Sequence, residues 1–126
     1  VDVKDKLIHL TEHALCAYSD FPVSALLETE KGLVPGVNIE CSEWNLGLCA
    51  ERVAVSRAIS AGFKSFKSIH VFAPKSEFIS PCGACRQVLS EWMSLEKVYL
   101  YHGNDSTTTH VLKHLLPFGF TTLPNK

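Results

Sequence analysis

Hydrophobic and polar positions recur along the chain with two different periods, which predict helices and strands in turn. Apolar side chains spaced by three and four predict an amphipathic helix over residues 3–17. An apolar run over 21–29 and its return over 33–39 are separated by the turn signal Glu30-Lys31-Gly32, and together they predict a two-stranded hairpin. Residues 40–48 have no clear period and are expected to form a loop.

The second half of the chain alternates between helical and strand patterns. Helix formers over residues 49–61 predict a helix that Gly62 ends. The further elements expected are a strand over 67–74, a helix from Cys82 to about Met93, a strand over 97–101, a short helix over 107–115, and a loop with a final short strand or tail from Pro117. This alternation predicts a layered α/β fold with a mixed sheet, in a single domain covering residues 1–126.

The composition and charge of the chain limit the kinds of molecule that it is expected to bind. The chain has 126 residues, 46% of them hydrophobic and 20% charged, and a net charge of −1 without clustered Lys or Arg. A protein that binds nucleic acid normally carries a basic stripe, so we expect a small-molecule substrate and no nucleic acid polymer. There is no run of 18 apolar residues, and the N-terminal residues are charged, so neither a membrane span nor an export signal is expected.

Five cysteines, an odd number, argue against a disulfide framework. They are Cys16, Cys41, Cys49, Cys82 and Cys85. A domain of this size does not need disulfides, and a set that contains C-x-x-C is more often metal-binding or catalytic. This favours a reducing compartment, and we expect a cytoplasmic protein.

Cys82 and Cys85 form a C-x-x-C at the predicted start of a helix, which fits a redox pair, half of a zinc site or chance. Cys49 supplies a third thiol at another predicted helix start, where the helix dipole favours thiolate. Three protein ligands and one open position are the arrangement of catalytic zinc sites. Glu51 lies two residues after Cys49, where its carboxylate can face the open position and carry protons.

Two motifs together carry a family resemblance. Cys49-Ala50-Glu51-Arg52 and Pro81-Cys82-Gly83-Ala84-Cys85-Arg86-Gln87 resemble the small, homotetrameric cytidine deaminases that act on free nucleosides. The resemblance extends over nearly the whole chain through three further stretches: Tyr18 to Val23, Asn38-Ile39-Glu40, and Leu115 to Phe120. It implies a central mixed five-stranded sheet flanked by helices.

The resemblance also implies a reaction. Cys49, Cys82 and Cys85 would bind one Zn²⁺ per subunit, and Glu51 would carry the protons. Cytidine or deoxycytidine would be hydrolysed to the uridine product with release of ammonia, a step of pyrimidine salvage. Arg52 would hydrogen-bond the ligand sulfurs and offset their charge.

Further residues match substrate-binding positions of the family. Asn38 and Glu40 would hold the ribose 3′-hydroxyl. Phe21 and Phe120 would surround the base, with Phe120 arriving from a neighbouring subunit of a homotetramer, and Ala50 would also contact the substrate.

The sequence departs from the family after Glu40. The family usually has Asn, a small residue, Ala or Ser, and then an aromatic, commonly Tyr, whereas this chain reads Cys41-Ser42-Glu43-Trp44. Trp44, at the aromatic position near the ribose 5′ end, is larger and lacks a hydroxyl. Two alternatives therefore stay open: a deaminase of a related aminopyrimidine nucleoside, blasticidin-type or a modified cytidine, and a zinc-binding module without catalysis. The retained ribose pair argues against the first and Glu51 against the second.

The sequence contains a second pattern that could bind a metal. His9-Leu10-Thr11-Glu12-His13 fits H-x-x-E-H, a pattern of some zinc proteases. Both histidines fall on the edge of the polar face of the first predicted helix, away from its apolar stripe. We therefore expect surface histidines rather than ligands.

Overall fold

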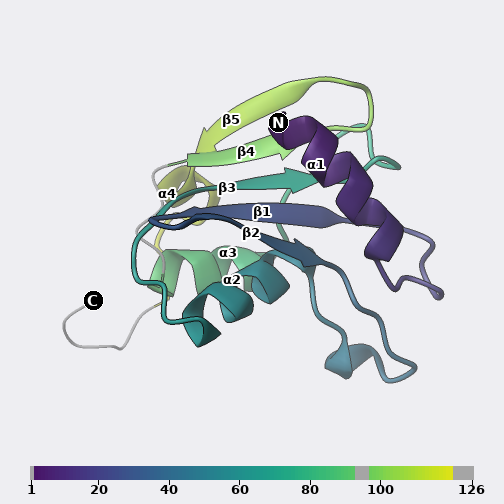
Figure 1. Cartoon of the computed structure of the whole chain (residues 1–126), viewed down its shortest axis with the longest axis horizontal. Helices are drawn as coiled ribbons and strands as arrows, with labels where there is room; N and C mark the ends of the chain where they lie inside the picture. The colour runs from purple at the N-terminus through teal and green to yellow at the C-terminus, as the bar shows by residue number, and fades with distance from the viewer. Residues whose placement is uncertain (1, 93–96, 121–126) are drawn as a thin grey trace.

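A computed structural model describes residues 2–92 and 97–120, which form one five-stranded sheet with helices on both faces (Figure 1). The order across the sheet is β2-β1-β3-β4-β5. The strands are β1 Ser24–Thr29, β2 Gly32–Val37, β3 Phe66–Phe72, β4 Lys97–Tyr101 and β5 Thr107–Val111. Only the neighbours β3 and β4 are parallel, so the predicted mixed sheet of five strands is confirmed.

The helices divide between the two faces of the sheet. Helix α1 Val3–Leu10 lies on one face, and α2 Ala50–Ser60 and α3 Gly83–Trp92 lie on the other (Figure 1). A short helix, α4 Leu112–Leu115, follows β5, and single 3₁₀ turns occur at η1 Thr11–His13 and η2 Trp44–Leu46. Both active-site motifs expected from the sequence are therefore at the start of helices on the same face.

Strand β1 is buried on both of its faces because it lies between β2 and β3 under helices on each side. Its side chains alternate: Ala25 and Leu27 join the main core under α2 and α3, whereas Leu26 packs in a smaller core with Leu7 of α1. Burying a leucine side chain stabilises the fold by about 1.5–3 kcal/mol. The alternation therefore fixes which face of the sheet receives which helix.

The first helix is shorter than the predicted 3–17. Helix α1 ends at Leu10, and the backbone of Ala14 is extended. The hydroxyl of Thr11 donates to the carbonyl of Ile8, a local bond that competes with the helical ladder. Beyond it, Leu15 pairs with Ile39 in an isolated bridge, so tertiary pairing overrides the helical spacing.

The prediction of a helix over 107–115 is wrong for most of its length. Residues Thr107–Val111 form the edge strand β5, which pairs antiparallel with β4, and only Leu112–Leu115 are helical. The run Thr-Thr-Thr-His-Val is rich in β-branched side chains, which favour strands. The expected final strand is not found over residues 117–120, and the rest of that prediction, like Met93, lies outside the described residues.

Other boundaries agree with the patterns. Helix α2 covers the predicted 49–61 to within one residue at each end, and Gly62 follows it with φ +85°. Strand β4 has the predicted bounds. None of the helices in the described part of the chain is long and apolar enough to cross a membrane.

Candidate active site

Three cysteine thiols meet where α2 and α3 begin. The Sγ atoms of Cys49 and Cys82 are 3.8 Å apart, those of Cys82 and Cys85 are 3.4 Å apart, and all three lie within 4.8 Å of one another. All five cysteines of the chain are free, and Cys16 and Cys41 lie outside this cluster. The structure therefore brings together the three cysteines predicted from the sequence and leaves the other two apart.

Helix starts place these thiols. Cys49 is the N-cap of α2, Cys82 directly precedes α3, and Cys85 lies in the first turn of α3. The backbone N–H of Cys85 donates to Cys82 Sγ at 3.4 Å. Free N–H groups and the positive end of the dipole favour negative charge at a helix start, so both helices stabilise thiolates in this position.

The donor set fits a zinc ion. Sulfurs at about 2.3 Å from a tetrahedral zinc are roughly 3.8 Å from one another, close to the separations found here. Hydrogen bonds from Cys85 and then Arg52 lower the pKa of Cys49 to about 5, despite the opposing effect of burial. The proximity of Cys49 and burial raise the pKa of Cys85, because neighbouring sulfurs resist a second negative charge. A divalent cation would remove that conflict and hold all three as thiolates.

Arg52 lies beside the sulfur cluster. Its Nη2 donates to Cys49 Sγ at 3.8 Å, and this bond is the largest cause of the raised pKa of Arg52. Its Nε is the buried side-chain nitrogen that has no hydrogen-bond partner within the described residues. A cation next to three sulfurs offsets part of the charge that they would carry as thiolates.

The carboxyl group of Glu51 is buried beside the cluster, with only 4% of the residue exposed. Burial raises the pKa of Glu51 to about 7, and the charge of Cys49 adds to this while Arg52 opposes it. A carboxyl group with a pKa near neutrality can both accept and release a proton at neutral pH. The side chain therefore suits proton transfer at this place.

A cavity of about 450 Å³ opens onto the cluster. Among its lining residues are nine positions predicted from the sequence: Phe21, Asn38, Glu40, Trp44, Cys49, Ala50, Glu51, Arg52 and Cys82. Cys85 is fully buried behind them. Segments far apart in the sequence thus contribute to one cavity whose volume suits a small molecule.

Asn38 and Glu40 are held in place by the segment before β1. The amide of Asn38 accepts from the Val23 N–H at 2.9 Å and donates to the Phe21 carbonyl at 2.8 Å. The carboxylate of Glu40 accepts from the hydroxyl and the N–H of Ser19, and these bonds lower the pKa of Glu40. An amide and a carboxylate each keep hydrogen-bonding capacity beyond these bonds, which a ligand can use.

Two predicted aromatic residues are strongly exposed. Trp44, in η2, is 70% exposed at the rim of the cavity, with its ring 6.4 Å from that of Tyr18. Phe120 is also 70% exposed and does not line the cavity of its own chain. Its carbonyl accepts from Gln87 Nε2.

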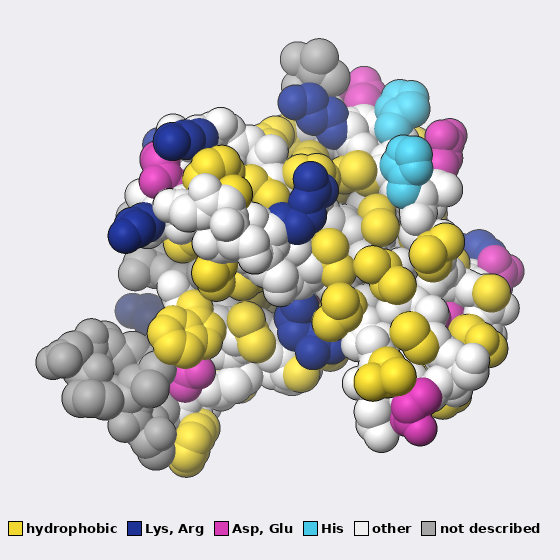
Figure 2. Space-filling view, turned by 60° about the horizontal axis from the view of Figure 1, so that its bottom comes forward, with side chains coloured by type: hydrophobic (Ala, Val, Ile, Leu, Met, Phe, Trp, Pro, Cys, Tyr) yellow, Lys and Arg dark blue, Asp and Glu magenta, His cyan; other side chains and the backbone are white. Residues whose placement is uncertain are grey.

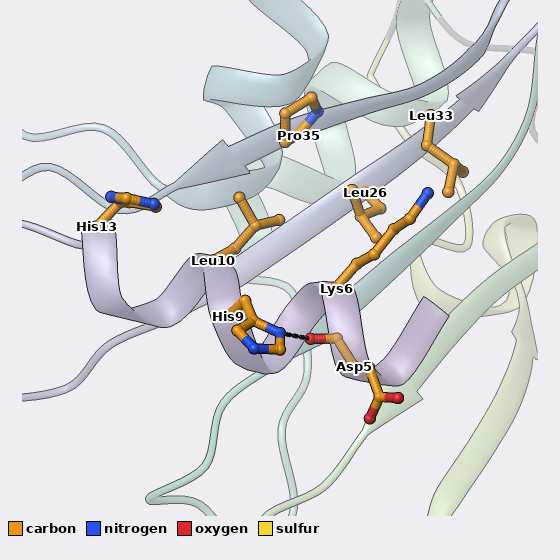
Figure 3. A pocket seen from close by; sticks show the side chains of 8 residues that line it. All are labelled: Asp5, Lys6, His9, Leu10, His13, Leu26, Leu33 and Pro35. Atoms are coloured by element: carbon orange, nitrogen blue, oxygen red, sulfur yellow. Dashed lines mark hydrogen bonds between the residues drawn. The ribbon is translucent and has the colours of Figure 1, made fainter. Parts of the chain in front are cut away.

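The H-x-x-E-H pattern does not form a metal cluster. His9 and His13 are exposed beside a separate groove between α1 and the hairpin strands (Figure 3). The Nδ1 of His9 bonds to the carbonyl of Asp5 at 2.8 Å. In the part of the chain that the structure describes, the three-cysteine cluster is the group of side chains placed to hold a metal. The expectation of surface histidines is confirmed.

Sequence reasoning missed several residues around the cavity. Ser19 and Ile79 line it, and the ring of His102 contacts the backbone of Ile79 from behind. Ser19 falls within the stretch from Tyr18 to Val23 that carries part of the resemblance, which is a signal that could have found it. A histidine at the end of a strand carries no such signal, because only the fold brings it to Ile79.

Known proteins are similar to this chain in sequence. A family model described as "Cytidine and deoxycytidylate deaminase zinc-binding region" matches residues 2–102. A cytidine deaminase from Sporosarcina psychrophila is 41% identical over 87% of this chain and 82% of its own length. A probable cytidine deaminase from Dictyostelium discoideum is 47% identical over 69% of this chain, and the match spans 60% of that protein.

A solved structure agrees in fold. The crystal structure of cytidine deaminase from Burkholderia pseudomallei superposes with a TM-score of 0.83 at 33% identity, covering 92% of this chain and 94% of that one. The match to the family model includes both motifs, residues 49–52 and 81–87, and the structural similarity includes the layered sheet that places them. This chain belongs to the cytidine and deoxycytidylate deaminase family, whose members are zinc-dependent hydrolytic enzymes.

Proposed function

We propose that this protein hydrolyses cytidine and deoxycytidine to uridine and deoxyuridine with release of ammonia. The observation that carries the proposal is one cavity in which the buried carboxyl group of Glu51 and the thiols of Cys49 and Cys82 meet the polar pair Asn38 and Glu40. The carboxyl group and the thiols suit hydrolysis, and the polar pair suits binding of a sugar. An enzyme that hydrolyses a nucleoside needs both sets of residues.

Cys49, Cys82 and Cys85 would hold one Zn²⁺ per chain in this proposal. Zinc, when bound, would make a water molecule acidic enough to serve as the nucleophile near neutral pH. The three thiolates carry one more negative charge than the ion balances. Arg52, 3.8 Å from Cys49 Sγ, offsets this excess.

Glu51 carries the protons of the reaction. Its carboxylate takes a proton from the attacking water and delivers it to N3 of the pyrimidine, which makes C4 electrophilic. It then passes a second proton from the added oxygen to the departing amine, so that one water is consumed and one ammonia leaves. The buried position of Glu51 keeps bulk water from competing for these protons.

Asn38 and Glu40 hold the ribose. Two of the four hydrogen-bonding capacities of the Asn38 amide are used by the backbone, which fixes the side chain and leaves an N–H and a lone pair for a hydroxyl. Glu40 is fixed by Ser19 in the same way. Phe21 and Ala50 contact the substrate as further lining residues, and Trp44 lies at the 5′ end of the sugar.

The oligomeric state, the cellular compartment, the pathway and the domain organisation are also part of the proposal. We infer a homotetramer in which Phe120 completes a neighbour's base pocket, because this side chain is exposed in its own chain. Five free cysteines suit the reducing cytoplasm, where the reaction serves pyrimidine salvage. Residues 1–126 act as one domain.

A panel of free nucleosides followed by ultraviolet absorbance and ammonia release tests the proposal. Cytidine and deoxycytidine are expected to be deaminated, and 3′-deoxycytidine to react poorly because its missing hydroxyl leaves Asn38 and Glu40 without a partner. A preference for a base-modified or blasticidin-type nucleoside would favour the alternative of a related aminopyrimidine nucleoside as substrate. Zinc binding without ammonia release from any member would contradict the proposal.

A further inference from the structure

His102 is a buried histidine just after β4, with only 2% of its surface exposed. Its Nδ1 is 2.9 Å from the backbone nitrogen of Ile79, and its Nε2 is 2.8 Å from Thr108 Oγ1. A backbone N–H can only donate, so Nδ1 is the acceptor and Nε2 carries the proton. Both ring nitrogens are therefore used, and the tautomer is fixed by the fold.

The same histidine holds the segment before Cys82 against the sheet by packing as well. The ring of Phe78 stacks on the imidazole, with centroids 4.8 Å apart and planes 15° from parallel. The next backbone N–H, that of Gly103, donates to the carbonyl of Ser76 at 2.6 Å. A side chain at Gly103 would collide with that carbonyl, because a Cβ there would come within 2.6 Å of it.

This segment leads directly into the sulfur cluster. Ile79, Ser80 and Cys82 all line the cavity of the candidate active site. Arg86 secures the end nearest the thiol: its Nε donates to the Pro81 carbonyl at 2.8 Å, and its Nη2 donates to Ser80 Oγ. The bond to His102 secures the other end, and it attaches the segment to the sheet rather than to α3.

We infer that His102 is a positioning residue for the zinc site, which acts by accepting the Ile79 N–H and so fixing the path of the backbone to Cys82. It touches neither the sulfurs nor the cavity, so its effect passes through Ile79 and Ser80. The inference rests on the proposed role of Cys82 as a zinc ligand.

The charge state of the ring supports this role. Burial, and then the neighbouring charge of His110, lower the pKa of His102, so Nδ1 stays free to accept at neutral pH. His110 is linked to the ring through Thr108, whose Oγ1 is 2.9 Å from His110 Nε2.

Three substitutions separate the hydrogen bond from the bulk of the ring. His102→Asn keeps an acceptor at the δ position, His102→Gln keeps a donor near the ε position, and His102→Phe keeps only the ring and its stacking. Zinc affinity is measured by competition with a chromophoric chelator, and thiolate geometry by the charge-transfer absorption of the Co²⁺-substituted protein. We expect zinc affinity to fall on the order of tenfold in His102→Gln and His102→Phe, with an altered cobalt spectrum, and to be largely restored in His102→Asn.

A structural role through packing predicts the reverse order, with His102→Phe the mildest. The matched control is His70→Phe, because His70 is also buried in this sheet and bonded, through Nδ1, to the hydroxyl of Tyr101. It should lower thermal stability without changing zinc affinity. Equal zinc affinities for the Asn and Gln variants of His102 would overturn the inference, and this comparison decides even if His102→Phe does not fold.

Cys82→Ala in the same assays separates this inference from the proposal on which it rests. If Cys82→Ala keeps wild-type zinc affinity, the ligand assignment itself fails. If Cys82→Ala loses zinc while all three His102 variants bind as the wild type does, only the positioning role is wrong.

Discussion

At the scale of single residues, Glu51 combines burial with a place beside the three thiols. Glu51→Gln keeps the size and hydrogen-bonding groups of the side chain but cannot take up and release a proton. We expect the variant to keep its fold and its zinc and to lose activity by about 10²–10⁴-fold or more, because general acid–base groups contribute that much to one step and Glu51 serves several. Steady-state rates and zinc content measured on one preparation check this.

The outcome that contradicts this role is specific. A loss below about tenfold, with zinc retained, would mean that a group other than Glu51 carries the protons. A loss of zinc together with activity would leave Glu51 a support for the cluster instead.

Cys82 and Cys16 form a matched pair for testing the metal. Cys82→Ala removes one of three sulfurs that lie within 4.8 Å of one another, so we expect zinc and activity to be lost together. Cys16→Ala removes a thiol outside the cluster and should leave about one zinc per chain. Metal analysis of the two purified variants makes the comparison. Full activity in Cys82→Ala would end the zinc assignment.

We expect His70 to make the stability of the fold depend on pH. Burial lowers its pKa, although the carboxylate of Glu28 opposes this. Since the folded-state pKa is below the unfolded value of about 6.5, the unfolded chain binds the proton first as pH falls. The contribution of His70 to stability is therefore complete above the unfolded-state pKa and is lost progressively as pH falls through the lower folded-state pKa.

The measurement is the free energy of unfolding in urea at about pH 7.5 and about pH 5.5. His70→Asn keeps a hydrogen-bonding partner for the hydroxyl of Tyr101 but does not titrate in this range. We expect the wild type to lose more stability than His70→Asn between the two pH values. Zinc release affects both proteins alike, so parallel losses would show that His70 is not the cause.

At the scale of elements, the sequence predicted the site better than the sheet edge. Cys49 and Cys82 could be placed because each directly precedes a helix that has a clear pattern. The sequence pattern predicted a helix where β5 lies, because a half-buried edge strand has no continuous apolar pattern of its own. Its strand conformation depends on hydrogen-bonded pairing with β4, which the local sequence does not reveal. The position of His102 behind Ile79 depends on that same pairing, so no local pattern could reveal it.

Helix α2 carries Glu51 and Arg52 and follows its N-cap Cys49. Gly36 of β2 sets how closely this helix approaches the sheet. A Cβ at Gly36 would lie 2.6 Å from the backbone nitrogen of Ala54 and would also collide with the carbonyl of Ala50. Backbone atoms cannot move aside as side chains do, so the helix would have to shift. We expect Gly36→Ala to cost about 1–3 kcal/mol of stability and to lower activity, because the shift displaces Glu51.

Thermal unfolding and kcat measured on the same protein check the effect of Gly36→Ala. Gly83→Ala is the control for stability alone, since a Cβ at Gly83 meets nothing within 4 Å. A Gly36→Ala protein as stable as Gly83→Ala would mean that α2 and β2 are not in tight contact.

At the scale of the whole molecule, many hydrophobic side chains are exposed. Figure 2 shows them spread over the face that carries α2, α3 and the η2 loop. Among the described residues, the most exposed large hydrophobic side chains are those of Trp44 and Leu46 in η2 and of Phe118 and Phe120 beyond α4. A closed symmetric assembly would cover them and would let each chain both give and receive Phe120.

Hybrid oligomers test whether the sites are shared. Glu51→Ala should be inactive, and Phe120→Ala impaired because it cannot complete a neighbour's base pocket. Unfolding and refolding the two variants together creates sites that take Glu51 from one parent and Phe120 from the other. Those sites are wild type in composition, so activity should rise above the sum of the separately refolded parents. Differently tagged parents show whether mixed oligomers have formed. If they have, and activity stays at the parental sum, Phe120 acts within its own chain and the shared-site proposal is wrong.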